Sequence, residues 1–403
     1  MNVLVVNCGS SSIKYSLMRM RDPESGDLAA SGLVERIGNP PSRIRHNAGG
    51  AEAARDVSAP DHPAAFALMI QALAEGPDAV IAGPCDIRAV GHRVVHGAER
   101  FTGSVRIDSE VLKALEDFSA LAPLHNPPNL AGIRAAMALM PDVPHVAVFD
   151  TAFHQTLPQH AFLYALPYDL YAKHRIRRYG FHGTSHRYVT EVAAKVLGRP
   201  LGQTNLITCH LGNGCSMAAV SGGKSVDTSM GLTPLEGLVM GTRSGDVDPA
   251  IVLHLVRALG MTADEVDDLL NRRSGLVGIS GLASSDMRDV MAAAEAGNQR
   301  ADLALEIFCY RIRKYIGAYT AVLGRVDGLV FTGGIGENAA DIRRRACRGL
   351  EPMGYILDDA RNAATDRRPR DVADDGSPHR ILVIPTDEEM VIARDTARIA
   401  AGG

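Results

Sequence analysis

The sequence predicts a mixed α/β protein of two or three domains. Short apolar runs bounded by Gly, Asn or Pro alternate with longer segments of helical period, which is typical of α/β proteins. The length of 403 residues corresponds to two or three domains at about 150 residues each. A strand–turn–strand segment near the N-terminus has a counterpart near the middle of the chain. That repetition is compatible with a duplicated domain or with chance.

The strands and helices are predicted from their apolar period and their capping residues. Five apolar runs are predicted as strands, at residues 3–6, 146–149, 206–209, 329–332 and 381–384. Helices are predicted to begin at Asp61, Ser109, Asp248 and Thr262, and a long one to span residues 301–323. Asp248 is followed by Pro249, and Thr262 is followed three residues later by Glu265, which are start signals of helices. Two polar stretches, 38–63 and 361–379, are predicted to be solvated surface loops.

The repeated segment consists of an apolar strand, a small polar turn and a returning strand. Residues 3–8 enter the turn of Gly9 to Ser12, and residues 13–17 return. Residues 206–209 enter the turn 210–216, and residues 217–220 return. Turns of Gly, Asn and Ser expose backbone N–H groups that suit phosphate oxygens. An ordinary Ser-rich turn remains the alternative.

Composition and charge exclude several classes of protein. Lys and Arg number 42 against 46 Asp and Glu, so the net charge is −4 and the chain lacks the basic footprint of a nucleic-acid binder. No apolar run approaches the ~20 residues of a membrane span, and no signal peptide is recognised. The six cysteines form no C-x-x-C pair, so reduced thiols are expected rather than disulfides or zinc. A cytoplasmic protein is therefore expected.

Two glycine-rich segments resemble common nucleotide motifs. Residues 222–225 resemble the end of a Walker A loop, but Ala218 stands where its first glycine is required. Residues 334–339 fit G-x-G-x-x-A after the strand 329–332, yet no βαβ pattern surrounds them. A close approach of this glycine turn to a nucleotide remains the expectation.

Several charged side chains occur where a ligand would need them. Arg93 lies within an apolar run, and Arg243 lies in a glycine-flanked loop. A guanidinium in such a setting needs an anion, either a substrate or a structural ion-pair partner. Asp150 follows a strand, where ligands bind in α/β proteins. No G-x-S-x-G motif occurs, so hydrolase chemistry is not expected.

Histidines occur in turns and in pairs. His125 and His182 lie in turns, where they face either a ligand or a structural partner. His92 and His96, like His182 and His186, are four residues apart but lack the Glu of a zinc-binding helix, so no zinc site is expected.

Taken together, these segments resemble the acetate kinase family. The matching text runs in order over nearly the whole chain: Asn-Cys-Gly-Ser-Ser-Ser-Ile-Lys (7–14), Gly-His-Arg-Val-Val-His-Gly (91–97), Ala-Pro-Leu-His-Asn-Pro-Pro (122–128), Phe-Asp-Thr-Ala-Phe-His (149–154), Arg-Tyr-Gly-Phe-His-Gly-Thr-Ser-His (178–186), His-Leu-Gly-Asn-Gly-Cys-Ser (210–216), Met-Gly-Thr-Arg-Ser-Gly-Asp (240–246), Phe-Thr-Gly-Gly-Ile-Gly-Glu-Asn (331–338) and Pro-Thr-Asp-Glu-Glu (385–389). The resemblance implies the superfamily of acetate and sugar kinases, heat-shock chaperones and actin.

For the fold, the resemblance implies two related actin-like ATPase domains of ribonuclease H-like fold, with the active site in the cleft between them. The N-terminal domain would comprise residues 1–150 and 389–403. The C-terminal, nucleotide-binding domain would comprise residues 151–388. Two chains would form a homodimer.

For function, the resemblance implies reversible transfer of the γ-phosphoryl group of ATP to acetate, giving ADP and acetyl phosphate. The reaction would use Mg²⁺, with Mn²⁺ as a substitute. Asn7 and Glu388 would hold the metal. The catalytic residues implied are Arg93, His125, Asp150, His182 and Arg243. The nucleotide-binding residues implied are Ser10, Ser12, Lys14, His210, Leu211, Gly212, Asn213, Gly214, Asp286, Met287, Arg288, Gly334, Ile335, Gly336, Glu337 and Asn338. The substrate-binding residues implied are Arg93, Val95, Leu124, Phe181 and Pro234.

The role of Asp150 and the size of the substrate need a physical argument. Acetate is already ionised at pH 7, so no general base is required, and Asp150 is expected to orient Arg93, His182 or the metal shell. One methylene changes discrimination by only about 1–3 kcal/mol, so propionate kinase is the alternative function.

Two more distant alternatives are disfavoured. A non-enzymatic, nucleotide-gated binding protein would need interaction extensions and would leave the two arginines without a role. A sugar kinase would need a site for a neutral hydroxyl group, whereas an arginine-rich site suits a carboxylate.

Overall fold

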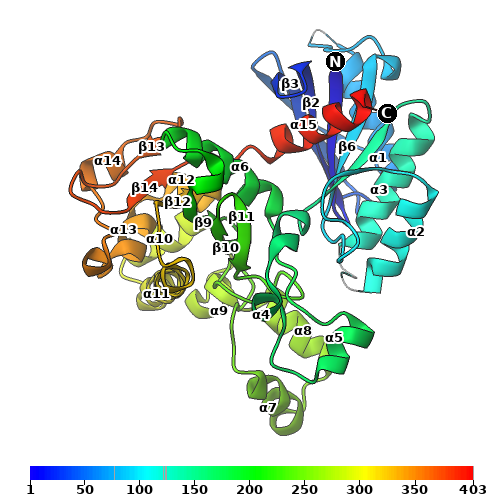
Figure 1. Cartoon of the computed structure of the whole chain (residues 1–403). Helices are drawn as coiled ribbons and strands as arrows, with labels where there is room; N and C mark the ends of the chain where they lie inside the picture. Colours follow the sequence, from blue (N-terminus) through cyan, green and yellow to red (C-terminus); the bar gives the residue numbers. More distant parts are fainter. Residues whose placement is uncertain (77, 121, 123–124, 403) are drawn as a thin grey trace. The chain divides into compact units, whose positions relative to one another are not determined.

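A computed structural model of the chain describes residues 1–76, 78–120, 122 and 125–402 (Figure 1). The chain divides into two compact units. The first unit comprises Met1–Ala152 and the C-terminal segment that begins at Asp387. The second unit is Phe153–Thr386. Each is described by itself below.

The first unit is built on an eight-stranded sheet with the order β5-β4-β3-β2-β1-β6-β8-β7. Strands β1, β6 and β8 run parallel, whereas β1 through β5 form an antiparallel meander. The strands are β1 (Asn2–Cys8), β2 (Ser12–Asp22), β3 (Ser25–Glu35), β4 (Ser42–Ala48), β5 (Ala51–Val57), β6 (Ile87–Val94), β7 (Val105–Arg106) and β8 (His145–Phe149).

Helices cover both faces of this sheet, because side chains that alternate along β1 pack against different helices. Leu4 and Val6 pack into one core with residues of α1 (His62–Ala74) and α3 (Asn126–Leu139). Val3 and Val5 point the other way and pack against α15 (Glu388–Ala401). Helix α2 (Ser109–Asp117) closes a third cluster. Central parallel strands that are buried on both faces require such continuous apolar runs.

The second unit repeats the same strand plan in a six-stranded sheet of order β11-β10-β9-β12-β14-β13. Strands β9, β12 and β14 run parallel, and β9, β10 and β11 are antiparallel. The strands are β9 (Asn205–Leu211), β10 (Cys215–Ser221), β11 (Lys224–Thr228), β12 (Gly328–Thr332), β13 (Arg370–Asp371) and β14 (Arg380–Val383). The order β3-β2-β1-β6-β8 therefore corresponds to β11-β10-β9-β12-β14, which confirms the duplicated α/β fold that the resemblance implies.

The helices of the second unit begin largely where their capping residues predict. Asp248 caps a helix that starts at Pro249, and Thr262 with Glu265 forms a complete capping box. The helices are α4 (Gln159–Phe162), α5 (Tyr168–His174), α6 (Gly183–Val196), α7 (Pro249–Leu259), α8 (Ala263–Arg272), α9 (Gly275–Ser280), α10 (Met287–Glu295), α11 (Gln299–Leu323), α12 (Gly333–Asn338), α13 (Ala340–Cys347) and α14 (Asp359–Ala363). Short 3₁₀ helices lie at Pro84–Asp86, Phe118–Ala120, Ala152–Thr156, Leu201–Gln203 and Glu351–Met353. None of the helices described is both long and apolar enough to cross a membrane.

The prediction that residues 38–63 form a loop is wrong. Most of this stretch forms the antiparallel pair β4 and β5 at the edge of the first sheet. Ile44 and Ala48 of β4 are buried, so the strand carries an alternation of period two among polar residues. Strand β5 is exposed along almost its whole length, and an edge strand of this kind carries no apolar signal.

The prediction for residues 361–379 is wrong in part. This stretch includes the end of α14 and the short strand β13. It also contains Ala373, which forms an isolated bridge with Leu357. The glycine pair that resembled a Walker A loop has a structural role instead. Gly222 and Gly223 have φ values of +56° and +79°, and they make the turn between β10 and β11.

Candidate active site

A buried ion pair lies at the carboxyl ends of two neighbouring parallel strands in the first unit. Arg93 comes from the end of β6, and Asp150 directly follows β8. Arg93 Nε and Nη2 donate to the two carboxylate oxygens of Asp150 at 3.0 and 2.7 Å. The Asp150 side chain is 2% exposed and that of Arg93 is 22% exposed. Asp150 therefore fixes the direction of a guanidinium that still reaches the surface.

The charges around Arg93 keep it ionised. Burial alone favours the neutral form, but Asp150 and then Glu388 raise the pKa of Arg93 above its usual value. The guanidinium is therefore a permanent cation at this strand edge, as an anion-binding group must be.

The loop that follows β6 is fixed by two buried amides that the sequence analysis did not single out. Asn129 accepts from Val95 N at 3.0 Å and donates to Cys8 O at 2.7 Å. Asn126 accepts from His96 N and donates to His96 O. Both amides lie at the start of α3, in the Asn-Pro-Pro-Asn segment, where prolines already predict a helix start. They hold Val95, a predicted substrate contact, beside the end of β1.

The turn between β1 and β2 is tight and lies beside the start of the last helix. Gly9 N donates to Ser12 O at 2.8 Å. Ser10 is exposed and Ser12 is partly buried. Asn7 and Lys14 are paired across the two strands, and Lys14 forms an ion pair with Glu389 of α15. Although burial raises the pKa of Glu389, Lys14 holds that pKa below its usual value.

The residues expected to hold Mg²⁺ have suitable chemistry. Asn7 and Glu388 supply neutral and anionic oxygens, which are the ligands that Mg²⁺ prefers in proteins. Lys14 pairs with Asn7 across the strands and contacts Glu389, so the end of β1 and the start of α15 lie close together. Among the described residues, no cluster of three or more His, Cys, Asp or Glu has metal-binding geometry. The two-residue set therefore fits an ion that keeps several waters and binds substrate phosphates.

A network of histidines and hydroxyls surrounds His182 in the second unit. His182 precedes α6 with a φ of +56°, a left-handed conformation that is rare outside glycine. Its Nδ1 lies 2.9 Å from Ser216 Oγ, which also lies 2.8 Å from His186 Nε2. His186 Nδ1 in turn lies 2.8 Å from Thr208 Oγ1. The ring of His182 is thus held by a chain of three buried side chains, and the sequence analysis gave none of them this role.

His186 stays neutral inside this network. Burial, followed by the charges of His154 and His210, lowers the pKa of His186 well below 6.5. A neutral ring with fixed bonds at both nitrogens cannot turn freely, so it orients the Ser216 hydroxyl group toward His182.

Arg243 lies beside His182 but has no acidic partner within the described part of the chain. Its Nη1 donates to Pro234 O at 2.5 Å, and no described carboxylate lies within ion-pair distance. A side chain on Gly214 would come within 2.7 Å of Arg243 Nη2 and 3.4 Å of His182 Cε1. Burial lowers the pKa of Arg243. A half-buried guanidinium with no carboxylate is the arrangement expected of a site for an anionic ligand.

The loop between β9 and β10 follows His210 and carries the backbone toward this cation. Gly212 N donates to Gly214 O at 3.1 Å, and Gly241 N donates to Asn213 O at 2.9 Å. The His210 ring lies against that of His182, with centroids 4.3 Å apart, and its Nδ1 lies 2.8 Å from Ser185 Oγ. This loop occupies the same place in its sheet as the β1–β2 turn occupies in the first.

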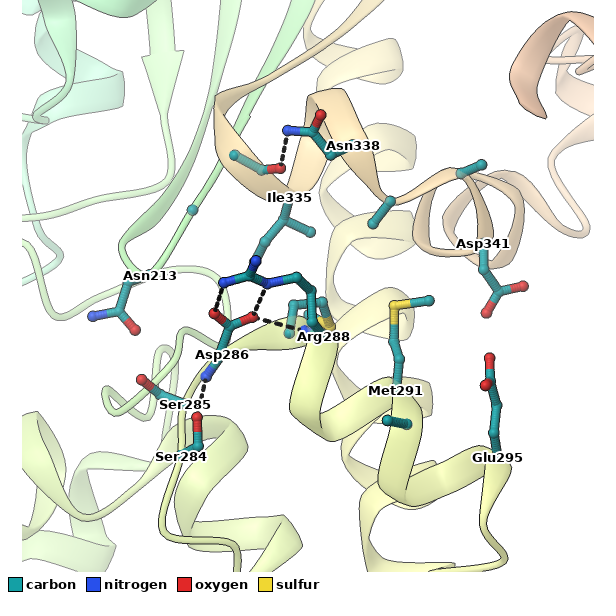
Figure 2. A pocket seen from close by; sticks show the side chains of 16 residues that line it. Asn213, Ser284, Ser285, Asp286, Arg288, Met291, Glu295, Ile335, Asn338 and Asp341 are labelled. Carbon is teal, nitrogen blue, oxygen red and sulfur yellow. Dashed lines mark hydrogen bonds and ion pairs between the residues drawn. The ribbon is translucent and has the colours of Figure 1, made fainter. Parts of the chain in front are cut away.

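A pocket of about 1060 Å³ lies next to this loop (Figure 2). Three segments form its walls: the loop at Gly212 and Asn213, residues 284–295 around the start of α10, and residues 334–341 of α12 and α13. A side chain added to Gly334 would meet no atom within 4 Å. The pocket volume is at the upper end of what small-molecule sites have, and a glycine on its wall lets a ligand approach the backbone.

Asp286 and Arg288, which both line this pocket, form a bidentate ion pair (Figure 2). Asp286 also caps α10 by accepting from Arg288 N at 2.9 Å. These hydrogen bonds from Arg288 lower the pKa of Asp286 to about 2. The Arg288 side chain is 89% exposed, so it is available to a ligand.

The structure distributes the predicted site residues over several places. Eight of the predicted nucleotide contacts line the pocket: Gly212, Asn213, Asp286, Met287, Arg288, Gly334, Ile335 and Asn338. Glu337 instead accepts from Gly333 N at 2.9 Å and Thr386 N at 3.0 Å, and Gly336 is buried inside α12. Phe181 is buried before α6, and His125 is exposed before α3. Leu124 lies outside the described residues.

Known proteins resemble this chain along nearly its whole length. The model of the Acetokinase family matches residues 2–394. An acetate kinase of Clavibacter michiganensis is 56% identical over 401 residues, which cover 99% of each chain. An acetate kinase of Clostridium novyi is 54% identical over 399 residues, which cover 99% of this chain and 98% of that protein.

Solved structures agree with the sequence relatives. The crystal structure of Porphyromonas gingivalis acetate kinase superposes with a TM-score of 0.94 at 46% identity, and the match covers 99% of each chain. The structure of a propionate kinase from Francisella tularensis superposes with a TM-score of 0.92 at 43% identity, again over 99% of each chain. The likeness therefore includes both domains and both kinds of carboxylate kinase.

Proposed function

Because the chain belongs to the acetokinase family, we propose that it catalyses reversible transfer of the γ-phosphoryl group of ATP to acetate. The products are acetyl phosphate and ADP. Transfer is direct and in line, because the acetate carboxylate is itself the nucleophile. The enzyme is a kinase, and its contribution is to position two anions and to neutralise their charge.

The observation that carries this proposal is the environment of Arg243. This arginine is half-buried, lies beside His182 and the backbone of Gly214, and has no described carboxylate partner. An uncompensated cation of this kind has a role only when an anion arrives. A transferring phosphoryl group, with charge spread over its equatorial oxygens, supplies that anion.

The remaining residues take roles that follow from their contacts. Arg93, aimed by Asp150, binds the carboxylate of acetate. Arg243 and His182 stabilise the phosphoryl group in the transition state. The ring of His210 packs against that of His182. His125 is a supporting donor. Val95, Leu124, Phe181 and Pro234 enclose the methyl group of the substrate.

We propose residues 151–388, which include all of the second unit (Phe153–Thr386), as the nucleotide-binding domain, and residues 1–150 with 389–403 as the other domain. Adenosine binds in the pocket, because its walls combine apolar side chains with backbone that a ligand can approach. These walls are at Gly212, Asp286 to Arg288 and Gly334 to Asn338. His210, Leu211, Asn213, Gly214 and the turn of Ser10, Ser12 and Lys14 contact phosphates. Asn7 and Glu388 hold Mg²⁺, which when bound neutralises the phosphate oxygens of ATP; Mn²⁺ has the same coordination chemistry.

Acetate is favoured over propionate as the substrate because the relatives of highest identity described above are acetate kinases. The two substrates differ by one methylene, so the discrimination should be about 10- to 200-fold. The test compares kcat/KM for acetate, propionate and butyrate, with hydroxylamine trapping the acyl phosphate. A higher kcat/KM for propionate would replace the proposal by propionate kinase, and no acyl phosphate with any of the three would refute it.

A homodimer and a cytoplasmic location complete the proposal. Helix α7 has no buried residue, and it exposes the large apolar side chains of Ile251, Leu253, Val256 and Leu259. Such a surface is expected to be covered by another protein molecule, and a second copy of this chain is proposed. All six cysteines are free thiols, as in a reducing compartment.

A further inference from the structure

A second pocket, of about 440 Å³, adjoins the nucleotide pocket, because Asn338 and Ala340 line both. Its walls come from the end of α12, from the start of α13 with Arg343, and from residues 362–370 at the end of α14 and beyond it. In Figure 1, α13, α14 and β13 lie together in the orange part of the second unit. The roles proposed above for ATP and acetate use none of the three arginines on its walls. These are Arg343, Arg367 and Arg370.

Arg343 brings a buried charge that no carboxylate neutralises. Its side chain is among the largest that are fully buried, and the residue is 1% exposed. Its guanidinium donates to Asn362 Oδ1 and Asn362 O at 2.7 Å each, and to Gly336 O at 2.8 Å. These are neutral acceptors, and among the described residues no acidic group lies within ion-pair distance. Burial, and then the like charge of Arg370, lowers the pKa of Arg343 to about 10.

Arg370 has one donor without an acceptor. Its Nη1 donates to Asp366 O, its Nη2 reaches Glu337 O only at 3.5 Å, the limit of a hydrogen bond, and its buried Nε has no hydrogen-bond partner. Burial lowers the pKa of Arg370. An unsatisfied buried donor is unfavourable unless a ligand supplies the acceptor.

The acidic residues on the walls are engaged elsewhere. The Asp366 carboxylate is bound by Arg368, whose Nη2 approaches to 2.7 Å. The Glu337 carboxylate accepts from the backbone of Gly333 and Thr386. Both act on Arg370 only at longer range. Arg367 is exposed and makes no ion pair with a described residue. The pocket thus carries three arginines that form no ion pair with a described carboxylate, and one buried donor on its walls, Arg370 Nε, lacks an acceptor.

We propose that this pocket binds a small oxyanion with at least two negative charges, of the phosphate class. Its volume lies near the lower end of the range for small-molecule sites, so a phosphate group with a short carbon chain would also fit. Asn338 and Ala340 line both this pocket and the nucleotide pocket. Anion binding therefore alters the affinity of the nucleotide pocket through this shared wall.

The test measures binding of inorganic phosphate by isothermal titration calorimetry to the full-length protein. An Arg243→Gln background removes the phosphate affinity of the proposed active site. In that background phosphate still binds, and Arg367→Gln/Arg370→Gln weakens binding about tenfold or more, as expected for lost charge-assisted hydrogen bonds. Arg361→Gln, on the neighbouring α14 but paired with Asp358 and Asp375 outside the pocket walls, leaves the affinity within about twofold. Thermal unfolding verifies that each variant is folded, and the single variant Arg367→Gln decides the question if the double variant is not.

The outcomes are distinct. Absence of phosphate binding in the Arg243→Gln background, or binding that the two arginine substitutions leave unchanged, would overturn the proposal. Titration with glycerol 3-phosphate distinguishes the sources: tighter binding than inorganic phosphate identifies a phosphorylated metabolite, and weaker binding identifies free phosphate. In the Arg243→Gln background, saturating phosphate should change the Kd for ADP, and addition of Arg367→Gln/Arg370→Gln should abolish that change. An equal response in both proteins would contradict the coupling. None of these readouts depends on which carboxylate the enzyme uses.

Discussion

Two arginines of this chain show how the partner of a buried charge decides its function. Arg93 has a carboxylate that holds it in one direction, whereas Arg243 has only a carbonyl oxygen. The Arg93 guanidinium is oriented before a ligand arrives, whereas no described carboxylate neutralises the charge of the Arg243 guanidinium. Pre-orientation reduces the entropy lost when a ligand binds. A guanidinium without a carboxylate partner strengthens the binding of an anionic ligand.

Substitution of Asp150 separates orientation from proton transfer. In Asp150→Asn the guanidinium of Arg93 loses the anion that aims it, so kcat/KM should fall by about a hundredfold or more. Because acetate is already ionised, the acidic limb of the pH–rate profile should stay where it is in the wild type. The measurement is kcat/KM for acetate from pH 5 to 9, with Asp117→Asn on the exposed end of α2 as the control. A limb that moves or vanishes would make Asp150 a proton-transfer group instead.

At this scale the sequence shows which residues matter better than it shows their partners. Arg93 and Asp150 were singled out separately, because each is a charge in an apolar or strand-end setting. Their pairing was one of three expectations for Asp150, beside His182 and the metal shell, and the sequence could not choose among them because the choice depends on β6 lying next to β8. Ser216, Thr208 and Asn129 were missed for the same reason: each is an ordinary polar residue until the fold brings its partner close.

At the scale of elements, capping residues and apolar runs predicted most of the described central structure. The parallel strands β1, β8, β9, β12 and β14 are buried on both faces, so their sequences are continuously apolar. Helix starts at Asp61, Asp248 and Thr262 carry side chains that cap backbone N–H groups, and all three predictions are confirmed. The edge strand β5 was not predicted, because its side chains are exposed and its sequence therefore lacks the apolar alternation on which the prediction of a strand depends.

The short helix α12 gives a prediction about nucleotide binding. A side chain at Gly334 has open space in the protein, so Gly334→Val should fold normally and fill part of the pocket. The KM for ATP should rise about tenfold or more, with a smaller change in the KM for acetate. The matched control is Gly317→Val, at a helical glycine of α11 that also has open space around it. If Gly334→Val kept the wild-type KM for ATP, α12 would not be a nucleotide contact.

Two neighbouring strands carry a pair of buried histidines that makes stability depend on pH. His92 of β6 and His145 of β8 lie 3.0 Å apart, Nε2 to Nδ1. Burial, and then His145, lowers the pKa of His92 well below 6.5, and burial lowers that of His145. In the unfolded chain both titrate near pH 6.5, so the unfolded state binds more protons below that pH. The free energy of unfolding should therefore fall as the pH drops below about 6.5, by up to about 1.4 kcal/mol per pH unit for each histidine.

Urea unfolding between pH 7.5 and 5 measures this slope. The double variant His92→Leu/His145→Met, which replaces both partners by apolar groups, should reduce the slope. His174→Gln, at the exposed end of α5, should leave it unchanged. Equal slopes for the wild type and the double variant would contradict the expectation.

At the scale of the whole molecule, the duplication was the least predictable feature from residues alone. The two strand–turn–strand segments have little sequence in common, and hairpins whose turns consist of Gly, Asn and Ser are frequent. The repeat becomes plain only in the strand orders of the two sheets, which coincide over five strands each. Similar hydrogen-bonding plans arise from different side chains, so topology persists where sequence likeness has faded.

The apolar helix α7 gives a prediction about assembly. Light scattering after size exclusion should give twice the chain mass of 42.9 kDa for the wild type. Ile251→Glu/Leu253→Glu places two charges on the exposed face, and it should reduce the mass to that of one chain. Leu28→Glu, at an exposed leucine of β3 in the first unit, should remain a dimer. A wild type that runs as one chain would refute the homodimer.

The position of α15 has a consequence for synthesis on the ribosome. This helix covers one face of the first sheet, yet it is the last element of the chain, after the whole second unit. At roughly 5–20 residues per second, the nascent first unit waits about ten seconds or more with Val3, Val5 and Val148 uncovered. During that interval it exposes an apolar sheet face of the kind that aggregates or recruits chaperones. The second unit, continuous in sequence, is free to fold first, so the C-terminal half of the chain matures before the N-terminal half.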